Sequence, residues 1–215
     1  LRESIEKGEK PQQQVTTATE GASAVLFSIA GALNREGAEE IVTLYLQIAH
    51  ELDSKSADTL ILLGGLAENL KQPERAIEFY SKVPATSPMH RISELQLGLT
   101  LAQTGKVDEA REHLKSLLAS DPKDIRSYLA YGSVLSDAKD YKAMAENYDK
   151  AVEMLGPVAK RGDWAVYFQR GIAYERLKDW DQAEPNFKKA RELNPEQPQV
   201  RHSPGYSWVH KELNP

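Results

Sequence analysis

Hydrophobic residues recur at helical spacing along most of this chain, and the pattern is clearest between residues 164 and 195. In the first half of that stretch, residues three or four apart form one apolar face, namely Tyr167, Gly171, Tyr174 and Leu177. In the second half the same spacing joins Trp180, Ala183, Phe187 and Ala190. Because residues at these spacings share one side of an α-helix, the stretch predicts two amphipathic helices in an antiparallel hairpin.

A glycine in the first of these helices marks an internal repeat. A mid-helix glycine costs about 1 kcal/mol relative to alanine, so Gly171 indicates that a neighbouring helix comes close there. The residues that correspond to Gly171 in the other repeats are Ala30, Gly64, Gly98, Gly132 and Gly205. Successive members of this series are 34 residues apart, except that Gly132 and Gly171 are 39 residues apart. A large residue stands sixteen positions after Ala30, Gly64, Gly98, Gly132 and Gly171, and these large residues are Leu46, Tyr80, Leu114, Tyr148 and Phe187.

This repeat resembles the tetratricopeptide repeat, which has a period of 34 residues, Gly at the eighth place, Ala at the twentieth and Pro near the end. The resemblance covers residues 23 to 211 and implies an all-α fold, a right-handed α-solenoid of antiparallel helix pairs with about five and a half repeats. The chain departs from the family pattern at Ala30, Val42, Met144 and Arg170, and only the fifth repeat has tyrosine, Tyr174, at the eleventh place.

The repeats are expected to start near residues 23, 57, 91, 125 and 164, with a half repeat from 198. The predicted helix pairs are 22–36 with 38–52, 57–70 with 73–83, 91–104 with 107–119, 125–138 with 141–155, and a fifth pair between 164 and 195. Residues 1–20 are interpreted as a flexible N-terminal segment or linker, and residues 21–215 as the repeat array. The half repeat is expected to form a helix from Pro204 to Glu212, capped by Ser203, whose Tyr206 and Trp208 cover the last full repeat.

Composition narrows the functional classes. The net charge of -5 and the pI near 5.6 argue against a nucleic-acid-binding surface, which needs a basic stripe. The chain has no cysteine, which excludes thiolate metal sites. Its longest apolar run, residues 21–33, is shorter than the roughly 20 residues that a membrane span needs, so no transmembrane segment is expected.

Catalytic chemistry is not indicated by any motif. The histidines make no compact ligand set, the glycines near residue 105 do not have phosphate-loop spacing, and no nucleophile elbow is present. We therefore expect no enzyme activity, no metal and no cofactor.

In arrays that this chain resembles, places five and nine of each first helix line the inner surface. The large apolar residues at these places are Phe27, Ile61, Leu95, Leu99, Leu129, Phe168 and Ile172. Polar residues expected to fix the edges of such a groove are Asn69, Gln96, Gln103, Gln169 and Arg176. Because place five carries no lysine and place nine no asparagine, the resemblance does not extend to relatives that grip a chaperone's carboxylate tail.

The hypothesis that follows is a non-enzymatic scaffold that binds a helical or extended peptide segment of a partner protein in a largely apolar concave groove. Two alternatives remain: a substrate-recruiting region of a larger protein with a separate enzyme domain, and self-association through the C-terminal half repeat. The sequence also resembles repeat proteins of Gram-negative bacteria, many of them exported, which favours the periplasm or envelope over the cytoplasm.

Overall fold

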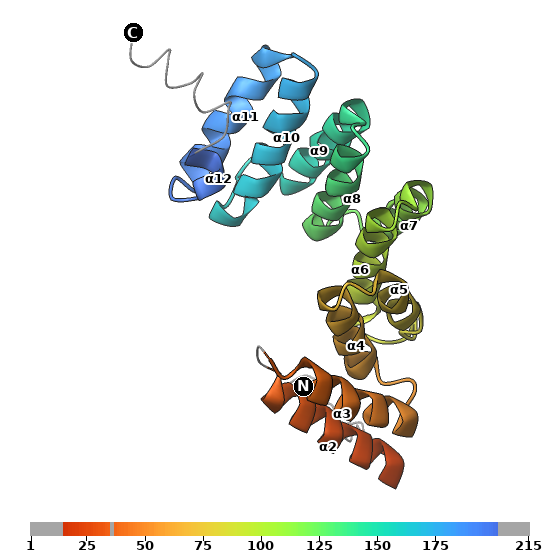
Figure 1. Cartoon of the computed structure of the whole chain (residues 1–215). Coiled ribbons are helices and arrows are strands. Elements are labelled where there is room, and N and C mark those ends of the chain that lie inside the picture. The colour runs from red at the N-terminus through yellow and green to blue at the C-terminus, as the bar shows by residue number, and fades with distance from the viewer. Residues whose placement is uncertain (1–14, 35–36, 202–215) are drawn as a thin grey trace, which may run out of the picture. The chain divides into compact units, whose positions relative to one another are not determined.

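In the computed structural model of the chain, residues 15–34 and 37–201 are described, and within these ranges the regular structure is helical (Figure 1). The all-α prediction is therefore confirmed. The chain divides into two compact units, residues 1–93 and 94–215.

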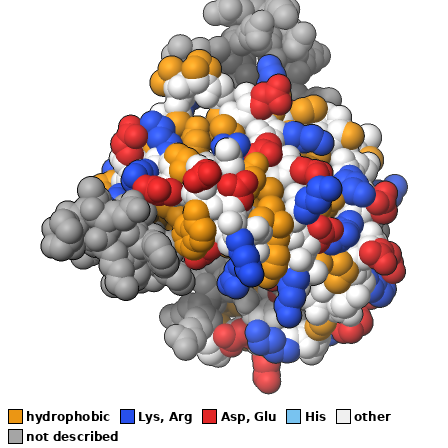
Figure 2. Space-filling view, turned by 90° about the horizontal axis from the view of Figure 1, so that it is seen from above, with side chains coloured by type: hydrophobic (Ala, Val, Ile, Leu, Met, Phe, Trp, Pro, Cys, Tyr) orange, Lys and Arg blue, Asp and Glu red, His pale blue; other side chains and the backbone are white. Residues whose placement is uncertain are grey.

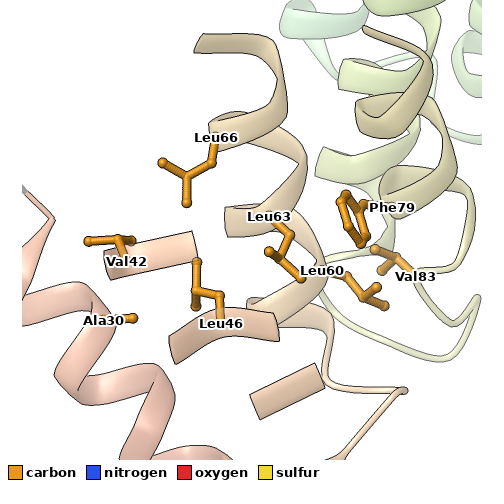
Figure 3. Packing of buried hydrophobic residues seen from close by; sticks show 8 residues of the cluster. All are labelled: Ala30, Val42, Leu46, Leu60, Leu63, Leu66, Phe79 and Val83. Carbon is orange, nitrogen blue, oxygen red and sulfur yellow. The ribbon is translucent and has the colours of Figure 1, made fainter. Parts of the chain in front are cut away.

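Unit 1 consists of two antiparallel helix pairs. They are formed by α2 (Ala18–Leu33) with α3 (Glu39–Leu52), and by α4 (Ala57–Asn69) with α5 (Pro73–Ser81). Helix α6 (His90–Gln103) begins at the end of this unit and continues into unit 2. Buried side chains of all four helices and of the turn after α5 meet in one core, which Figure 3 shows: Ala30, Val42, Leu46, Leu60, Leu63, Leu66, Phe79 and Val83.

Unit 2 continues the series of helices. After α6 come α7 (Val107–Ser120), α8 (Ile125–Asp137), α9 (Tyr141–Leu155), the short 3-10 helix η1 (Arg161–Asp163), α10 (Trp164–Arg176), α11 (Trp180–Leu193) and α12 (Pro198–Arg201). The predicted bounds of α3 to α9 agree with these to within two residues. The longer spacing before the fifth repeat is occupied by the loop that contains η1, in which the Asp163 carboxylate accepts a hydrogen bond from the Lys160 N–H at 2.7 Å.

The predicted start of the first helix is wrong by four residues. Helix α2 begins at Ala18 rather than residue 22, because Thr17 caps it. The Thr17 hydroxyl accepts a hydrogen bond from the Glu20 N–H, and the Glu20 carboxylate accepts one from the Thr17 N–H, both at 3.1 Å. This reciprocal capping box makes residues 18–20, interpreted above as linker, the first turn of the helix.

The repeating glycines are explained by close helix contacts inside each pair. A Cβ at Gly98 would lie 2.7 Å from Leu114, and one at Gly171 would lie 2.8 Å from Phe187. Gly64 and Gly132 face Tyr80 and Tyr148 in the same way, with even less room. The large residue sixteen positions on therefore fills the space that the glycine leaves, and this contact sets the spacing of the two helices. Burial raises the pKa of the Tyr148 hydroxyl, which keeps this side chain neutral.

The turn inside each helix pair uses a left-handed residue at the fifteenth place of every repeat. These residues have φ between 57° and 83°, and they are Gly37, Lys71, Gly105, Lys139 and Lys178. In the left-handed region a side chain costs about 1–2 kcal/mol, so the three lysines occupy positions that favour glycine.

The half repeat is described only at its beginning. Helix α12 places Val200 in the core of the fifth helix pair, where its side chain is 4% exposed. The expected helix from Pro204 to Glu212, with Ser203, Tyr206 and Trp208, lies outside the described residues, as do residues 1–14 of the predicted N-terminal segment.

Candidate functional site

Four of the predicted groove residues lie on the first helices of unit 2. Leu95 and Leu99 belong to α6, Leu129 to α8 and Ile172 to α10, and all four are half-buried. Helices α8 and α10 lie next to each other. An apolar side chain that keeps part of its surface in water is available to a ligand in a way that a core residue is not.

Phe168 does not belong to this set of accessible residues. It is only 8% exposed, and its ring packs edge to face on Phe187 at a centroid distance of 5.9 Å. The centre of the Trp164 ring lies 6.1 Å from that of Phe168, and Val200 of α12 belongs to the same cluster. Because the fifth helix pair has this additional helix against it, a position expected to line an open groove is closed.

The two apolar groove residues of unit 1 are Phe27 in α2 and Ile61 in α4. Both are half-buried and pack against the core of that unit. Asn69, the last residue of α4, is exposed.

The polar residues expected at the groove edge in unit 2 differ in exposure. Gln96 and Gln169 are half-buried, whereas Gln103 and Arg176 are exposed. The Arg176 guanidinium lies 5.9 Å from the centre of the Tyr141 ring on α9, a cation–π contact. Arg176 is therefore held against the neighbouring helix.

A polar cluster joins α9 to α10, and sequence reasoning did not foresee it. Arg170 Nε donates a hydrogen bond to Asp149 Oδ1 at 2.7 Å, and the Tyr174 hydroxyl donates to the same carboxylate at 2.9 Å. Burial, followed by the hydrogen bond to Asp149, raises the pKa of the Tyr174 hydroxyl, which therefore remains a donor. The departure from the family pattern at Arg170 was the available signal, because a charged residue at an apolar place needs a partner. The cluster thus connects α9 to α10.

Charge and metal chemistry add little to the site. On the face shown in Figure 2, Lys and Arg side chains are interspersed with Asp and Glu. Within the described ranges, no group of three or more His, Asp or Glu residues is placed to hold a metal ion. The His113 imidazole lies 3.0 Å from the Glu94 carboxylate, which links α7 to α6. None of the helices in the described part is both long and apolar enough to cross a membrane.

Three sequence models of the tetratricopeptide repeat match the chain, over residues 57–83, 95–143 and 164–197. Among solved structures, MamA 41-end from Desulfovibrio magneticus RS-1 is 22% identical with a TM-score of 0.67, over 84% of this chain and 99% of that one. YrrB, described as a TPR protein with an unusual peptide-binding site, is 16% identical with a TM-score of 0.60, over 86% of this chain and 97% of that one. These likenesses show the fold, an α-solenoid of helix pairs.

Two curated relatives match a shorter part of the chain. BBSome complex member BBS4 of Bos taurus is 32% identical over 90 residues, which is 42% of this chain and 17% of that protein. BBSome complex member bbs-4 of Caenorhabditis elegans is 29% identical over 101 residues, 47% of this chain and 22% of that protein. The chain thus corresponds to about a fifth of the length of these relatives.

Proposed function

Since the chain belongs to the tetratricopeptide-repeat family, we propose that it is a non-enzymatic scaffold that binds a peptide segment of a partner protein on the first helices of unit 2. The family match and the similar solved structures support a protein–protein interaction scaffold. That the peptide binds on the first helices of unit 2, and through which residues, is what we propose in addition.

The observation that carries this proposal is the set of half-buried apolar residues Leu95, Leu99, Leu129 and Ile172. They come from α6, α8 and α10, the first helices of successive repeats, and α8 and α10 lie next to each other, so a ligand lying across these two would contact both repeats. Gln96 and Gln169 stand beside them and offer amide donors and acceptors without a net charge.

The ligand that this chemistry favours is apolar in its anchors and low in charge. A helical segment would present side chains at i, i+3 and i+4, and an extended segment would present alternate side chains. Either segment would bury the exposed part of each leucine, which stabilises a complex by about 25 cal/mol per Å² of apolar surface removed from water. The glutamine amides would hydrogen-bond to the peptide's polar groups at the edge.

Selection from a random-peptide phage library with the purified chain tests the proposal. We expect the enriched peptides to carry spaced apolar anchors. Leu95→Glu and Leu129→Glu should each weaken binding of a selected peptide at least about tenfold, which corresponds to 1.4 kcal/mol, because a carboxylate would have to be desolvated beneath an apolar anchor.

The matched control is Ser116→Glu, which adds the same charge at an exposed position of α7. Circular dichroism establishes that each variant retains its helices, and Leu129→Ala serves where the glutamate variant does not fold. Peptides whose affinity is the same for wild type, Leu95→Glu and Leu129→Glu would place their binding site elsewhere and overturn the proposal.

The alternative in which the repeats recruit substrates for a separate enzyme domain makes the same prediction for these variants. It differs in what lies beyond this sequence, since only the full reading frame would show a catalytic domain.

A further inference from the structure

A carboxylate lies one helical turn beyond the groove residue Ile172. Glu175 follows Ile172 by three positions on α10, and residues three apart on a helix lie on the same side, with their Cβ atoms about 5–6 Å apart. Both residues are half-buried. The apolar surface proposed to bind a peptide therefore has an acidic group at its border on α10.

Three features of the structure make the charge of Glu175 unfavourable. Burial raises the pKa of its carboxyl group, and the positive charge of Arg176 offsets only part of this effect. The residue stands in the last turn of α10, at the negative end of the helix dipole, where cations rather than anions are stabilised. Within the described ranges, its carboxylate accepts no hydrogen bond and forms no ion pair. The fold therefore desolvates this group without compensating for the loss of water.

Glu175 differs in this respect from similar groups nearby. Every other half-buried carboxylate in the described part of unit 2 has a partner. Glu94 pairs with His113, Asp124 with Arg126, Asp140 with Arg111, Asp149 with Arg170, Asp163 with the Lys160 N–H, and Glu184 with Lys188. Because buried charges are normally paired, the exception indicates that the partner of Glu175 comes from a ligand.

The basic residues beside the same surface are already engaged. On α8 and α10, the charged residues three or four positions from Leu129 or Ile172 are Arg126, Glu175 and Arg176. Arg126 Nε donates a hydrogen bond to Asp124 Oδ1 at 3.1 Å, and the Arg176 guanidinium lies 5.9 Å from the centre of the Tyr141 ring. The charge that is left uncompensated on this part of the surface is therefore negative.

We propose that the peptide bound by unit 2 carries a lysine or arginine beside one of its apolar anchors, and that this cation pairs with Glu175 while the anchor packs on Ile172. The inference rests on the proposed function and adds to it the position of one charge in the ligand. A cation at this point would give the carboxylate the charge-assisted hydrogen bond that the fold does not supply, and the helix end would favour it as well.

The short separation of Ile172 and Glu175 determines where the cation stands in the ligand. In a helical ligand it would stand three or four positions from the anchor, which is one turn. In an extended ligand it would stand two positions away, on the same side of the strand. Lysine and arginine both have apolar stems, so either could lie along Ile172 while its charged end reaches Glu175.

Calorimetric titration of the whole chain with a phage-selected peptide tests the inference. The peptide is acetylated at its N-terminus, so that its cation is a side chain. Glu175→Gln should weaken binding of a lysine-bearing peptide at least about threefold at low salt, and the loss should be smaller in about 0.5 M NaCl because salt screens the pair. Replacing the lysine by norleucine should weaken binding to wild type by a similar factor, after which Glu175→Gln should cause no further loss.

Two further variants separate a specific pair from a general effect of charge. Glu146→Gln removes a carboxylate at an exposed position of α9 and should leave the affinity unchanged. Glu175→Lys should reverse the preference, so that a peptide with glutamate in place of lysine binds more tightly than the lysine peptide. Without peptide, Glu175→Gln should keep or slightly raise the unfolding temperature, because it removes a charge that nothing in the fold stabilises.

The outcomes distinguish this inference from the proposed function. Selected peptides without a basic residue, or equal affinities of wild type and Glu175→Gln for the lysine peptide, overturn the inference, whereas the proposed function fails only if Leu95→Glu and Leu129→Glu leave binding unchanged. A lower unfolding temperature of Glu175→Gln without peptide would show that another part of the chain already pairs with the carboxylate, which overturns the inference as well.

Discussion

The first and the fifth helix pairs are built on the same plan but are completed differently. In the fifth pair, Gly171 receives the ring of Phe187, Phe168 is buried beside it, and Val200 of α12 covers the cluster. In the first pair, Ala30 and Leu46 replace the glycine and the aromatic ring, and Val25 and Ile29 of α2 are exposed. Because each pair depends on its neighbours for burial, the same place in the repeat is core in one pair and surface in another.

The largest difference in stability between the two helix pairs is expected from substitutions at the fifth place of the repeat, which is Phe168 in the fifth pair and Phe27 in the first. Phe168→Ala should destabilise unit 2 by about 3–5 kcal/mol, because it removes a buried ring and leaves a cavity. Phe27→Ala, at the same place of α2, should cost less, because Phe27 is only half-buried. Urea denaturation measures both.

The tryptophans make this measurement specific to unit 2. The chain has three, at positions 164, 180 and 208, and all lie in that unit. Tryptophan fluorescence should therefore follow the loss caused by Phe168→Ala, while circular dichroism follows both units. Equal losses for the two variants would show that place five is core in both pairs.

The next effect concerns the glycine contact. Gly171→Ala should destabilise unit 2 by about 1–2 kcal/mol, since the added methyl would lie 2.8 Å from Phe187 and overpacking outweighs the better helix propensity of alanine. Gly31→Ala in α2 is the matched control, because nothing lies within 4 Å of its added Cβ. It should leave stability unchanged or raise it by up to about 1 kcal/mol, and thermal denaturation of both variants tests the sign.

These differences between the two pairs also show which features of the structure the sequence could predict. The 34-residue period predicted the helix pairs and their bounds, because a glycine and a large residue sixteen positions apart report a contact inside one pair. It did not predict that Phe168 is buried, because that depends on α12 and on the neighbouring Trp164, which vary between repeats. The departure at Arg170 indicated that this residue needs a partner, but the period did not identify Asp149, since the two residues belong to different repeats.

A smaller loss of stability is expected from shortening a valine, and it should depend on whether that valine is buried. Val200→Ala should destabilise unit 2 by about 1.5 kcal/mol, because two buried carbon atoms are lost from the cluster around Phe187. Val25→Ala, an identical change at a site that is 59% exposed, should change the stability by no more than about 0.5 kcal/mol. A comparable loss for Val25→Ala would mean that its side chain is buried in solution, as that of Val200 is.

The smallest effect compares the turns of the same two pairs. Lys178 in the fifth pair and Gly37 in the first both adopt left-handed backbone angles, with φ of 62° and 82°. Lys178→Gly should stabilise unit 2 by about 1 kcal/mol, because glycine relieves the steric cost of this conformation, and Gly37→Lys should destabilise unit 1 by a similar amount. The midpoint of thermal unfolding followed by circular dichroism measures both variants. If Lys178→Gly lowered this midpoint, the lysine side chain would have to make a contact worth more than the backbone strain, and the turns of the two pairs would then differ in their interactions as well as in their residues.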